Sequence, residues 1–320
     1  MPELPEVESV AKTLSLSSCV AGPTLVNFKH SRYQLRSAYP TQEQIDQILG
    51  MQLIRVYRRA KYLILVWGQK TDQKQSFSQN KIQEWAMIIH LGMTGSLVFY
   101  RKNQRNILDL AAGIMDSSQI IRKKTIILDQ IESTISHPHF YCEFSDGSSL
   151  IYSDPRRFGL VQLIPVAGIA RWEKHKELGV EPLSEEFTGS YLHNGLMRRK
   201  NSSIKRSLMD QKLVVGIGNI YTNEALFKAR IIPTRASGSL ILSEVEALVQ
   251  ASKEIIQLAI AKGGSTIRDY KNNDNQPGEF QNSLAVYGKK GEKCIRFCQG
   301  VIVKNMIEGR ATYWCESCQK

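Results

Sequence analysis

The chain has 320 residues, 42 Lys and Arg against 30 Asp and Glu, and a formal net charge of +12. Its length suits two or three domains, and 42% hydrophobic with 22% charged residues is typical of a globular protein. Six cysteines are too few for a secreted disulfide scaffold, and no apolar run is long enough for a transmembrane helix. Acidic residues without a basic segment near the N-terminus argue against a signal peptide. We therefore expect a cytoplasmic protein.

The positive charge is concentrated in the C-terminal part of the chain. From Gly195 to Lys320 there are 20 Lys and Arg but only 11 Asp and Glu. Such a segment indicates either a polyanionic partner such as nucleic acid or a solvated surface that keeps the protein soluble. Charge alone leaves both interpretations open.

The first half of the chain predicts two helices followed by a series of strands. Apolar spacing predicts a helix over Glu3–Ser18, and a capping box at Thr41 and Gln44 begins a second helix that ends near Gly50. Asp146-Gly147 is a hairpin signal between two strands. Short apolar runs predict strands at Leu53–Tyr57, Tyr62–Trp67, Ala86–His90, Ser96–Tyr100, Phe140–Phe144, Ser149–Tyr152 and Leu160–Ile164.

These patterns predict three domains of an α+β protein. Residues 1–184 form an antiparallel β-sandwich or β-barrel domain with an N-terminal helix, interrupted by insertions at about 69–83 and 101–136. Residues 185–285 form a helical domain, in which Ser243 and Glu246 are read as the capping box of a long helix that ends at Gly263-Gly264. Residues 286–320 contain four cysteines and are too short to build a core of their own.

The four C-terminal cysteines have the spacing of a metal site. Cys294, Cys298, Cys315 and Cys318 form C-x3-C and C-x2-C pairs separated by 16 residues. Four thiolates at the base of a hairpin predict one structural Zn²⁺ with no open coordination position. Two disulfides or four free thiols are the alternatives. Cys19 and Cys142 are expected to be small buried residues.

The N-terminal sequence Met1-Pro2-Glu3-Leu4-Pro5-Glu6-Val7-Glu8 is unusual. Removal of Met1 would leave Pro2 as a secondary amine, and an α-amine with a pKa of about 8 is a competent nucleophile at neutral pH. Glu3 beside it is able to transfer protons. An ordinary helix start rich in acidic residues is the alternative for this pattern.

This N-terminus resembles that of the bacterial formamidopyrimidine-DNA glycosylase family. Further motifs in the family's order cover nearly the whole chain apart from the two insertions. They are Arg58-Arg59-Ala60-Lys61-Tyr62, Ile89-His90-Leu91-Gly92-Met93-Thr94-Gly95, Asp154-Pro155-Arg156-Arg157-Phe158-Gly159, Leu208-Met209-Asp210, Gly218-Asn219-Ile220-Tyr221 and Gly309-Arg310-Ala311-Thr312.

The resemblance implies a monomeric base-excision repair enzyme that removes oxidised purines from double-stranded DNA and then cuts the abasic strand. The implied fold is a β-sandwich with an N-terminal helix, a helix-two-turn-helix domain and a zinc-finger hairpin. Pro2 resembles the Schiff-base nucleophile, and Glu3 resembles the acid and base at the sugar. Lys61, on a predicted strand, resembles the proton donor in strand cleavage, and Arg310 resembles the arginine that assists the second elimination.

DNA contacts are implied in the same way. Met93, Arg156 and Phe158 resemble the three residues that fill the gap left by an extruded nucleotide, a need shared by all base-flipping enzymes. Asn219 follows Gly216-Ile217-Gly218 in what resembles a phosphate-binding turn at the start of a helix. The remaining implied DNA contacts are His90, His137 and Lys200.

Three features depart from the family pattern. The first cysteine pair has three intervening residues, the β-domain loops are longer, and Pro138 follows His137 where relatives often carry an acid. Two alternatives stay open: an endonuclease VIII-like glycosylase for oxidised pyrimidines, and a non-catalytic zinc-dependent DNA-binding protein. Association with the bacterial nucleoid is a further expectation, and the loop near Ser265–Asn275 would govern the choice of lesion.

Overall fold

The computed structural model describes residues 2–17, 20–69, 83–101, 135–265 and 278–320. The chain divides into two units. The described residues of the first are Pro2, 7–17, 20–69, 83–101 and 135–172, and those of the second are Glu3–Glu6, 173–265 and 278–320. The expected insertions lie almost entirely outside the described residues, as do Cys19 and most of the loop near Ser265–Asn275.

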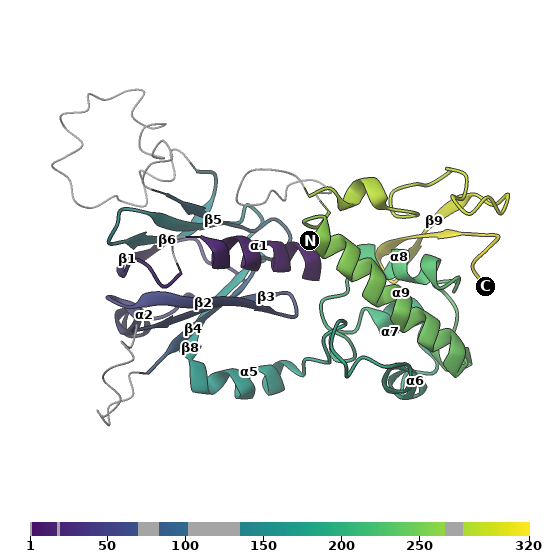
Figure 1. Ribbon diagram of the computed structural model, residues 1–320, viewed down its shortest axis with the longest axis horizontal. Helices are drawn as coiled ribbons and strands as arrows, with labels where there is room; N and C mark the ends of the chain where they lie inside the picture. Colours follow the sequence, from purple (N-terminus) through teal and green to yellow (C-terminus); the bar gives the residue numbers. More distant parts are fainter. Residues whose placement is uncertain (1, 18–19, 70–82, 102–134, 266–277) are drawn as a thin grey trace. The chain divides into compact units, whose positions relative to one another are not determined.

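Two four-stranded antiparallel sheets form the first unit (Figure 1). One sheet has the order β1-β6-β7-β5, with β1 at Leu25–His30, β5 at Ser96–Tyr100, β6 at Pro138–Phe144 and β7 at Ser149–Ser153. The other has the order β2-β3-β4-β8, with β2 at Gln52–Arg59, β3 at Tyr62–Gly68, β4 at Trp85–His90 and β8 at Leu160–Pro165. Apolar side chains from both sheets share one core, which gives the predicted sandwich.

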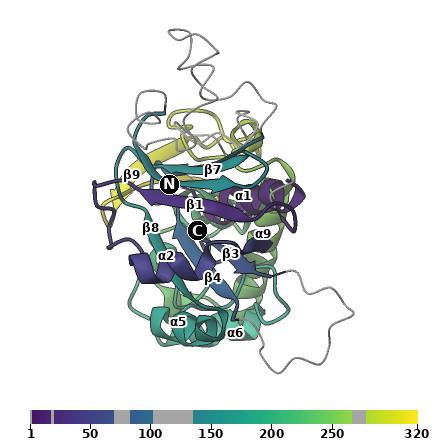
Figure 2. The ribbon, with the colours of Figure 1, turned by 90° about the vertical axis from the view of Figure 1, so that its left-hand side faces the viewer.

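Helices α1 (Leu4–Leu16) and α2 (Gln42–Ile48) pack against the core of the two sheets. Val7, Val10 and Leu14 of α1 are buried in the sandwich core. The predicted capping box of α2 is confirmed, because Thr41 and Gln44 each accept a hydrogen bond from the other's backbone N–H. Figure 2 shows α2 beside β8, where the Gln44 side chain donates to the Leu163 carbonyl at 2.9 Å.

All seven predicted strands are present, but β1 was not predicted. Its sequence, Leu-Val-Asn-Phe-Lys-His, has only two buried side chains, so no apolar run marks it. The hairpin signal at Asp146-Gly147 is confirmed: Gly147 has φ 82°, and the Asp146 carboxylate accepts from the Ser148 N–H at 2.9 Å. Cys142 is buried in β6, as expected.

The second unit is mainly helical. Helix α5 (Ile169–Lys176) crosses from the first unit into the second. The others are α6 (Gly189–Met197), α7 (Ile204–Leu208), α8 (Asn219–Lys228) and α9 (Leu242–Ala261). Short 3₁₀ turns lie at Val166–Gly168, Ser237–Ser239 and Phe280–Ser283. Helices α6, α8 and α9 bury their apolar faces in one core.

The predicted start of α9 was wrong. The capping residue is Ile241, and Glu244 accepts from its backbone N–H at 3.0 Å, so Ser243 and Glu246 lie inside the helix. Glu244 is held in this position by an ion pair at 2.6 Å with Arg235, which lies nine residues earlier and outside the capping pattern. Within the described ranges, no helix is both long and apolar enough to cross a membrane.

A two-stranded hairpin, β9 (Ile302–Ile307) and β10 (Arg310–Cys315), completes the second unit. Its base carries the cysteines, and its tip lies at Glu308-Gly309 between the strands. The segment leading to the hairpin is anchored by Glu224 of α8, whose carboxylate accepts from the N–H groups of Ala285, Val286 and Tyr287 at 2.8–3.0 Å.

Candidate active site and metal centre

The carboxylate of Glu3 lies at the N-terminus of α8. It is 2% exposed, and its oxygens accept from the backbone N–H groups of Gly218 at 2.8 Å and Ile220 at 3.2 Å. A Cβ at Gly218 would lie 2.4 Å from this carboxylate, so the contact requires glycine. Free helix N-terminal N–H groups favour an anion. The turn before α8 was expected to bind a DNA phosphate. Two of its backbone N–H groups instead donate hydrogen bonds to the carboxylate of Glu3.

Glu6 is a second buried carboxylate beside Glu3. Its Oε2 accepts from the Glu3 N–H at 2.8 Å, and its Oε1 accepts from the hydroxyl of Tyr221 at 2.5 Å and the N–H of Ser265 at 2.7 Å. Burial, with Glu6 as the nearest negative charge, raises the pKa of Tyr221 far above its usual value, so the phenol stays a donor. Glu6 thus fixes the backbone at Glu3 against α8 and the end of α9.

Lys61 and Pro2 belong to the first unit. Pro2 is buried. The prediction that Lys61 lies on a strand was wrong by one residue: it occupies the two-residue turn between β2 and β3, next to Ala60 at φ 55°. The lysine is only 6% exposed. A tight turn at the end of a hairpin holds a side chain more firmly than a long loop, which suits a group that acts at one atom.

The other candidates of the first unit lie at the ends of strands. Met93 follows β4 and is 40% exposed, and Phe158 precedes β8 and is 46% exposed. The guanidinium of Arg156 lies over the Phe158 ring at 4.8 Å, so these two side chains form one exposed group. His90 ends β4, accepts from the Gly92 N–H at 3.0 Å and contacts the Tyr62 ring. His137 is exposed, with φ 56°.

Arg310 is exposed at the start of β10, and the next three residues are all held by the helical domain. Asn219 donates to the Ala311 carbonyl at 2.9 Å, and Asn223 accepts from the Tyr313 N–H at 2.8 Å. The Lys205 ammonium donates to the Thr312 hydroxyl at 2.6 Å, and this hydroxyl donates to the Arg310 carbonyl at 3.0 Å. Because these bonds fix the backbone, the Arg310 side chain extends from a defined position.

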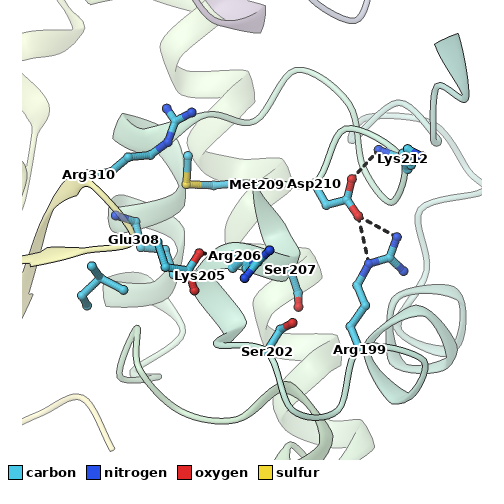
Figure 3. A pocket seen from close by; sticks show the side chains of 11 residues that line it. Arg199, Ser202, Lys205, Arg206, Ser207, Met209, Asp210, Lys212, Glu308 and Arg310 are labelled. Atoms are coloured by element: carbon cyan, nitrogen blue, oxygen red, sulfur yellow. Dashed lines mark hydrogen bonds and ion pairs between the residues drawn. The ribbon is translucent and has the colours of Figure 1, made fainter.

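Lys205 also lines a pocket of about 570 Å³ with a strongly basic wall (Figure 3). Arg199, Arg206, Lys212 and Arg310 line it as well, against the acidic Asp210 and Glu308. Arg199 is paired with Asp210 at 2.6 Å. Burial, and then the charge of Arg310, lower the pKa of Lys205 from 10.5 to about 8, although Glu308 acts in the opposite direction. Crowded cations of this kind favour an incoming anion.

Lys200 and Asn219 differ in the exposure and hydrogen bonding of their side chains. The Lys200 side chain is exposed near Gly238, whose N–H donates to the Lys200 carbonyl at 3.1 Å. The Asn219 amide nitrogen is already engaged with the hairpin, and its Oδ1 is buried with no hydrogen-bond partner. Asn219, the first residue of α8, therefore connects this helix to β10.

The four predicted metal ligands lie together. Their sulfur atoms are all within 4.8 Å of one another, with Cys298–Cys315 at 3.4 Å and Cys294–Cys318 at 3.9 Å. Disulfides would need a separation of about 2.05 Å. A tetrahedron with Zn–S distances of about 2.3 Å has edges of roughly 3.8 Å, so the cluster fits that ion. The longer first knuckle is accommodated by Phe297, which adopts φ 53° with its side chain 94% exposed.

Lys205, Glu6, Asn223 and Asp154 are residues whose roles the sequence did not reveal. Lys205 and Asn223 carry no spacing signal, and their partners lie about 90 or more residues away in the chain. Glu6 and Asp154 stand inside the quoted motifs. Their burial, at 2% and 0% exposure, marks them as important only once the fold is known.

Comparison with known proteins identifies the family. The model of the formamidopyrimidine-DNA glycosylase N-terminal domain matches residues 1–161, and that of the formamidopyrimidine-DNA glycosylase H2TH domain matches residues 178–271. A formamidopyrimidine-DNA glycosylase from Escherichia coli is 36% identical over 327 residues, with both chains fully covered.

Two solved structures have the same fold over their whole length. A Lactococcus lactis FPG variant in complex with Fapy-dG containing DNA has a TM-score of 0.79 and 31% identity, and each chain is covered completely. MutM in complex with carbocyclic 8-oxo-G containing DNA has a TM-score of 0.77 and 31% identity, again with full coverage of both chains. The family model over residues 1–161 and the 36% identity over the full length show that this chain belongs to the formamidopyrimidine-DNA glycosylase family.

Proposed function

We propose that this protein excises oxidised purines, 8-oxoguanine and formamidopyrimidines, from double-stranded DNA and cuts the strand at the resulting abasic site through a Schiff base on Pro2. The observation that carries this proposal is the full-length match to DNA glycosylases of this family, in which the nucleophile, acid and lysine motifs all remain in this chain. The enzyme is a DNA glycosylase with abasic-site lyase activity, and its substrate is damaged DNA.

The first step is attack of the Pro2 nitrogen on C1′ of the damaged nucleotide. The bond to the base breaks with its electron pair, and the base leaves as it is protonated. A secondary amine then gives an iminium ion with the opened sugar. Glu3, the adjacent residue, serves as acid and base at the sugar. Its fixed position supports this role because a proton-transfer group must lie at a defined distance from the reacting atom.

Strand cleavage follows by elimination from the iminium. Removal of a proton from C2′ expels the 3′ phosphate, and a second elimination expels the 5′ phosphate. We assign proton donation in strand cleavage to Lys61, whereas Arg310 binds the phosphates and assists the second elimination. Lys61 is held in a tight turn, and the backbone of Arg310 is fixed through Thr312 and Lys205. Hydrolysis of the iminium finally releases Pro2.

DNA binding is proposed to involve both units of the protein. Met93, Arg156 and Phe158 fill the space of the extruded nucleotide, and their exposure fits side chains that contact a partner. His90, His137, Lys200 and Asn219 contact the DNA backbone. Phosphate contacts of this type position the duplex without reading its sequence.

The four-cysteine cluster is proposed to hold one Zn²⁺ in a closed structural site. Four thiolates leave no position for water, so the metal would stabilise the hairpin and take no part in the chemistry. We further propose that the protein acts as a monomer in the cytoplasm, associated with the bacterial nucleoid.

Borohydride trapping tests the proposed nucleophile. Borohydride reduces the iminium, so the enzyme should become covalently linked through Pro2 to a duplex containing 8-oxoguanine opposite C. A protein with a cleavable N-terminal tag should not trap until the tag is removed to expose Pro2. A tagged protein of verified mass that traps at full yield would place the nucleophile elsewhere. A duplex with an oxidised pyrimidine, used in parallel, tests the lesion class.

A further inference from the structure

We propose that Asp154 and Thr94 are positioning residues that hold the Met93 loop and the Arg156–Phe158 loop at one fixed separation, so that the three exposed side chains act as a single plug. This inference rests on the proposed function, because a plug is needed only where a nucleotide is extruded from a duplex. It assigns a role to two residues that contact neither the base nor the reacting sugar.

Asp154 is hydrogen-bonded to both loops. Its Oδ1 accepts from the Thr94 hydroxyl at 2.6 Å and from the Arg156 N–H at 3.3 Å, and its Oδ2 accepts from the Gly159 N–H at 2.8 Å. Thr94 directly follows Met93, and Gly159 directly follows Phe158. One carboxylate therefore binds the backbone N–H of Arg156 and the residues next to Met93 and Phe158. Asp154 is 0% exposed, so water does not compete for these bonds.

The two loops also touch through their backbones. Gly92 has φ 68°, and a Cβ there would lie 2.6 Å from the Gly159 nitrogen. A Cβ at Gly159 would lie 1.8 Å from the hydroxyl of Tyr152, which itself donates to Asp154 at 3.4 Å. A side chain at Gly92 would separate the loops, and a side chain at Gly159 would displace the Tyr152 hydroxyl. The close approach explains why the motifs have glycine there, and it leaves the loops little freedom to shift independently.

A second layer supports Asp154 from the opposite side. The Asp154 carbonyl accepts from His139 Nε2 at 2.9 Å, and His139 Nδ1 bonds to the Tyr39 hydroxyl at 2.9 Å. Burial lowers the pKa of His139, so the ring is neutral at physiological pH, with its proton on Nε2. Asp154 is thus hydrogen-bonded through its backbone carbonyl as well as through its carboxylate.

A rigid plug matters because the gap in the duplex exists only while the nucleotide is extruded. Loops that moved independently would have to be ordered at that moment, and the entropy of ordering would reduce the population of the extruded state. Loops already linked through Asp154 avoid most of that cost. The linkage should therefore affect base excision from duplex DNA and leave Schiff-base chemistry on an accessible abasic sugar unchanged.

The test compares Thr94→Val with Thr94→Ser in the full-length zinc-loaded enzyme. Valine keeps the shape of threonine but removes the hydroxyl, whereas serine keeps the hydroxyl. We expect Thr94→Val to slow single-turnover excision of 8-oxoguanine from a duplex by about tenfold, the effect of losing one hydrogen bond to a buried charge. Thr94→Ser should stay within about twofold of the wild type. Met93→Ala is a reference: it measures how far the excision rate falls when one plug side chain is missing.

Three outcomes would overturn the inference. They are a Thr94→Val enzyme with wild-type duplex excision, an equal loss in the valine and serine variants, and an equal loss on a single-stranded abasic oligonucleotide. The last would mean general damage to the fold, which the thermal midpoint would also report. Asp154→Asn, which places an NH₂ among N–H donors, should show the same selective loss, only larger. A wild-type enzyme that neither traps nor excises would instead refute the proposed function.

Discussion

Glu3 is hydrogen-bonded to Gly218 and Ile220, and this contact determines what a substitution at Glu3 changes. Glutamine keeps the size of the side chain, but it has only one acceptor oxygen and cannot act as a carboxylic acid. Its NH₂ group would face one of the two backbone N–H donors. Glu3→Gln therefore removes the acid and one hydrogen bond together, while the Glu6 contact to the backbone N–H of residue 3 is retained.

We expect Glu3→Gln to slow base excision by roughly 100- to 10,000-fold, the usual contribution of a positioned acid or base. Cutting at a preformed abasic site should be largely retained, because the base has already left and the aldehyde condenses with Pro2 without that help. Single-turnover assays on the two substrates at equal enzyme concentration measure both rates. Equal losses on both would show that Glu3 acts in Schiff-base formation or in folding.

Lys205 makes both the stability of the protein and its DNA affinity depend on pH, each in a direction that its pKa shift predicts. Its pKa falls from 10.5 to about 8 on folding, so between these pH values the unfolded chain binds more protons than the folded one. The stability contribution of this group therefore rises with pH across that window. DNA phosphate near Arg310 would favour the protonated ammonium, so DNA binding should take up a proton near pH 8.

The corresponding prediction is that DNA affinity of the wild type falls between pH 7 and pH 9, by up to about tenfold if one proton is linked to binding. Lys205→Arg keeps the positive charge but does not titrate in this range, so its affinity should be nearly constant. Equilibrium binding of an abasic-analogue duplex at fixed ionic strength provides the comparison. The same pH dependence in both proteins would assign the linked proton to another group.

At the scale of elements, local patterns predicted the strands well and the element ends less well. Short apolar runs placed the seven strands, and each strand has one face in a shared core. The start of α9 was misplaced because Arg235, which pairs with Glu244, lies outside the capping pattern. A contiguous motif such as Pro2-Glu3 allowed candidate site residues to be named from the sequence. Contacts between distant residues could not be predicted, as for Lys205 and Thr312, which are 107 residues apart.

The metal site allows a direct test of the hairpin. We expect one Zn²⁺ per chain by elemental analysis, and Cys315→Ser should release it because three thiolates bind zinc far less tightly than four. DNA binding should weaken as the base of the hairpin loosens. Ser317→Ala, between two ligands, is the matched control and should retain the metal. Wild-type protein free of zinc after purification without chelators would contradict the assignment, with the three-residue knuckle at Phe297 as the suspected cause.

For the whole molecule, the charge distribution predicts steeply salt-dependent DNA binding. Each phosphate neutralised by a cation releases counterions, so the logarithm of the affinity should fall linearly with that of the salt concentration, with a slope of about 0.9 per contact. Arg310→Ala should reduce this slope by about one as well as lower the affinity. Lys320→Ala, which changes the charge equally at the chain end, is the control. A flat dependence between 50 and 200 mM salt, roughly the informative range, would argue against a basic DNA-binding surface.

Three hydrogen bonds hold Ala311, Thr312 and Tyr313 of β10 to the helical domain without involving a cysteine, and this has a consequence for how the hairpin opens. The Tyr313 amide donates to Asn223, whereas the Cys294 amide donates to the Gly300 carbonyl within the zinc knuckles. Chelation should therefore speed hydrogen–deuterium exchange at the knuckle amides first and leave the Tyr313 amide protected. Loss of metal would then be a local and reversible opening, because β10 stays attached to the helical domain and guides the cysteines back to their positions.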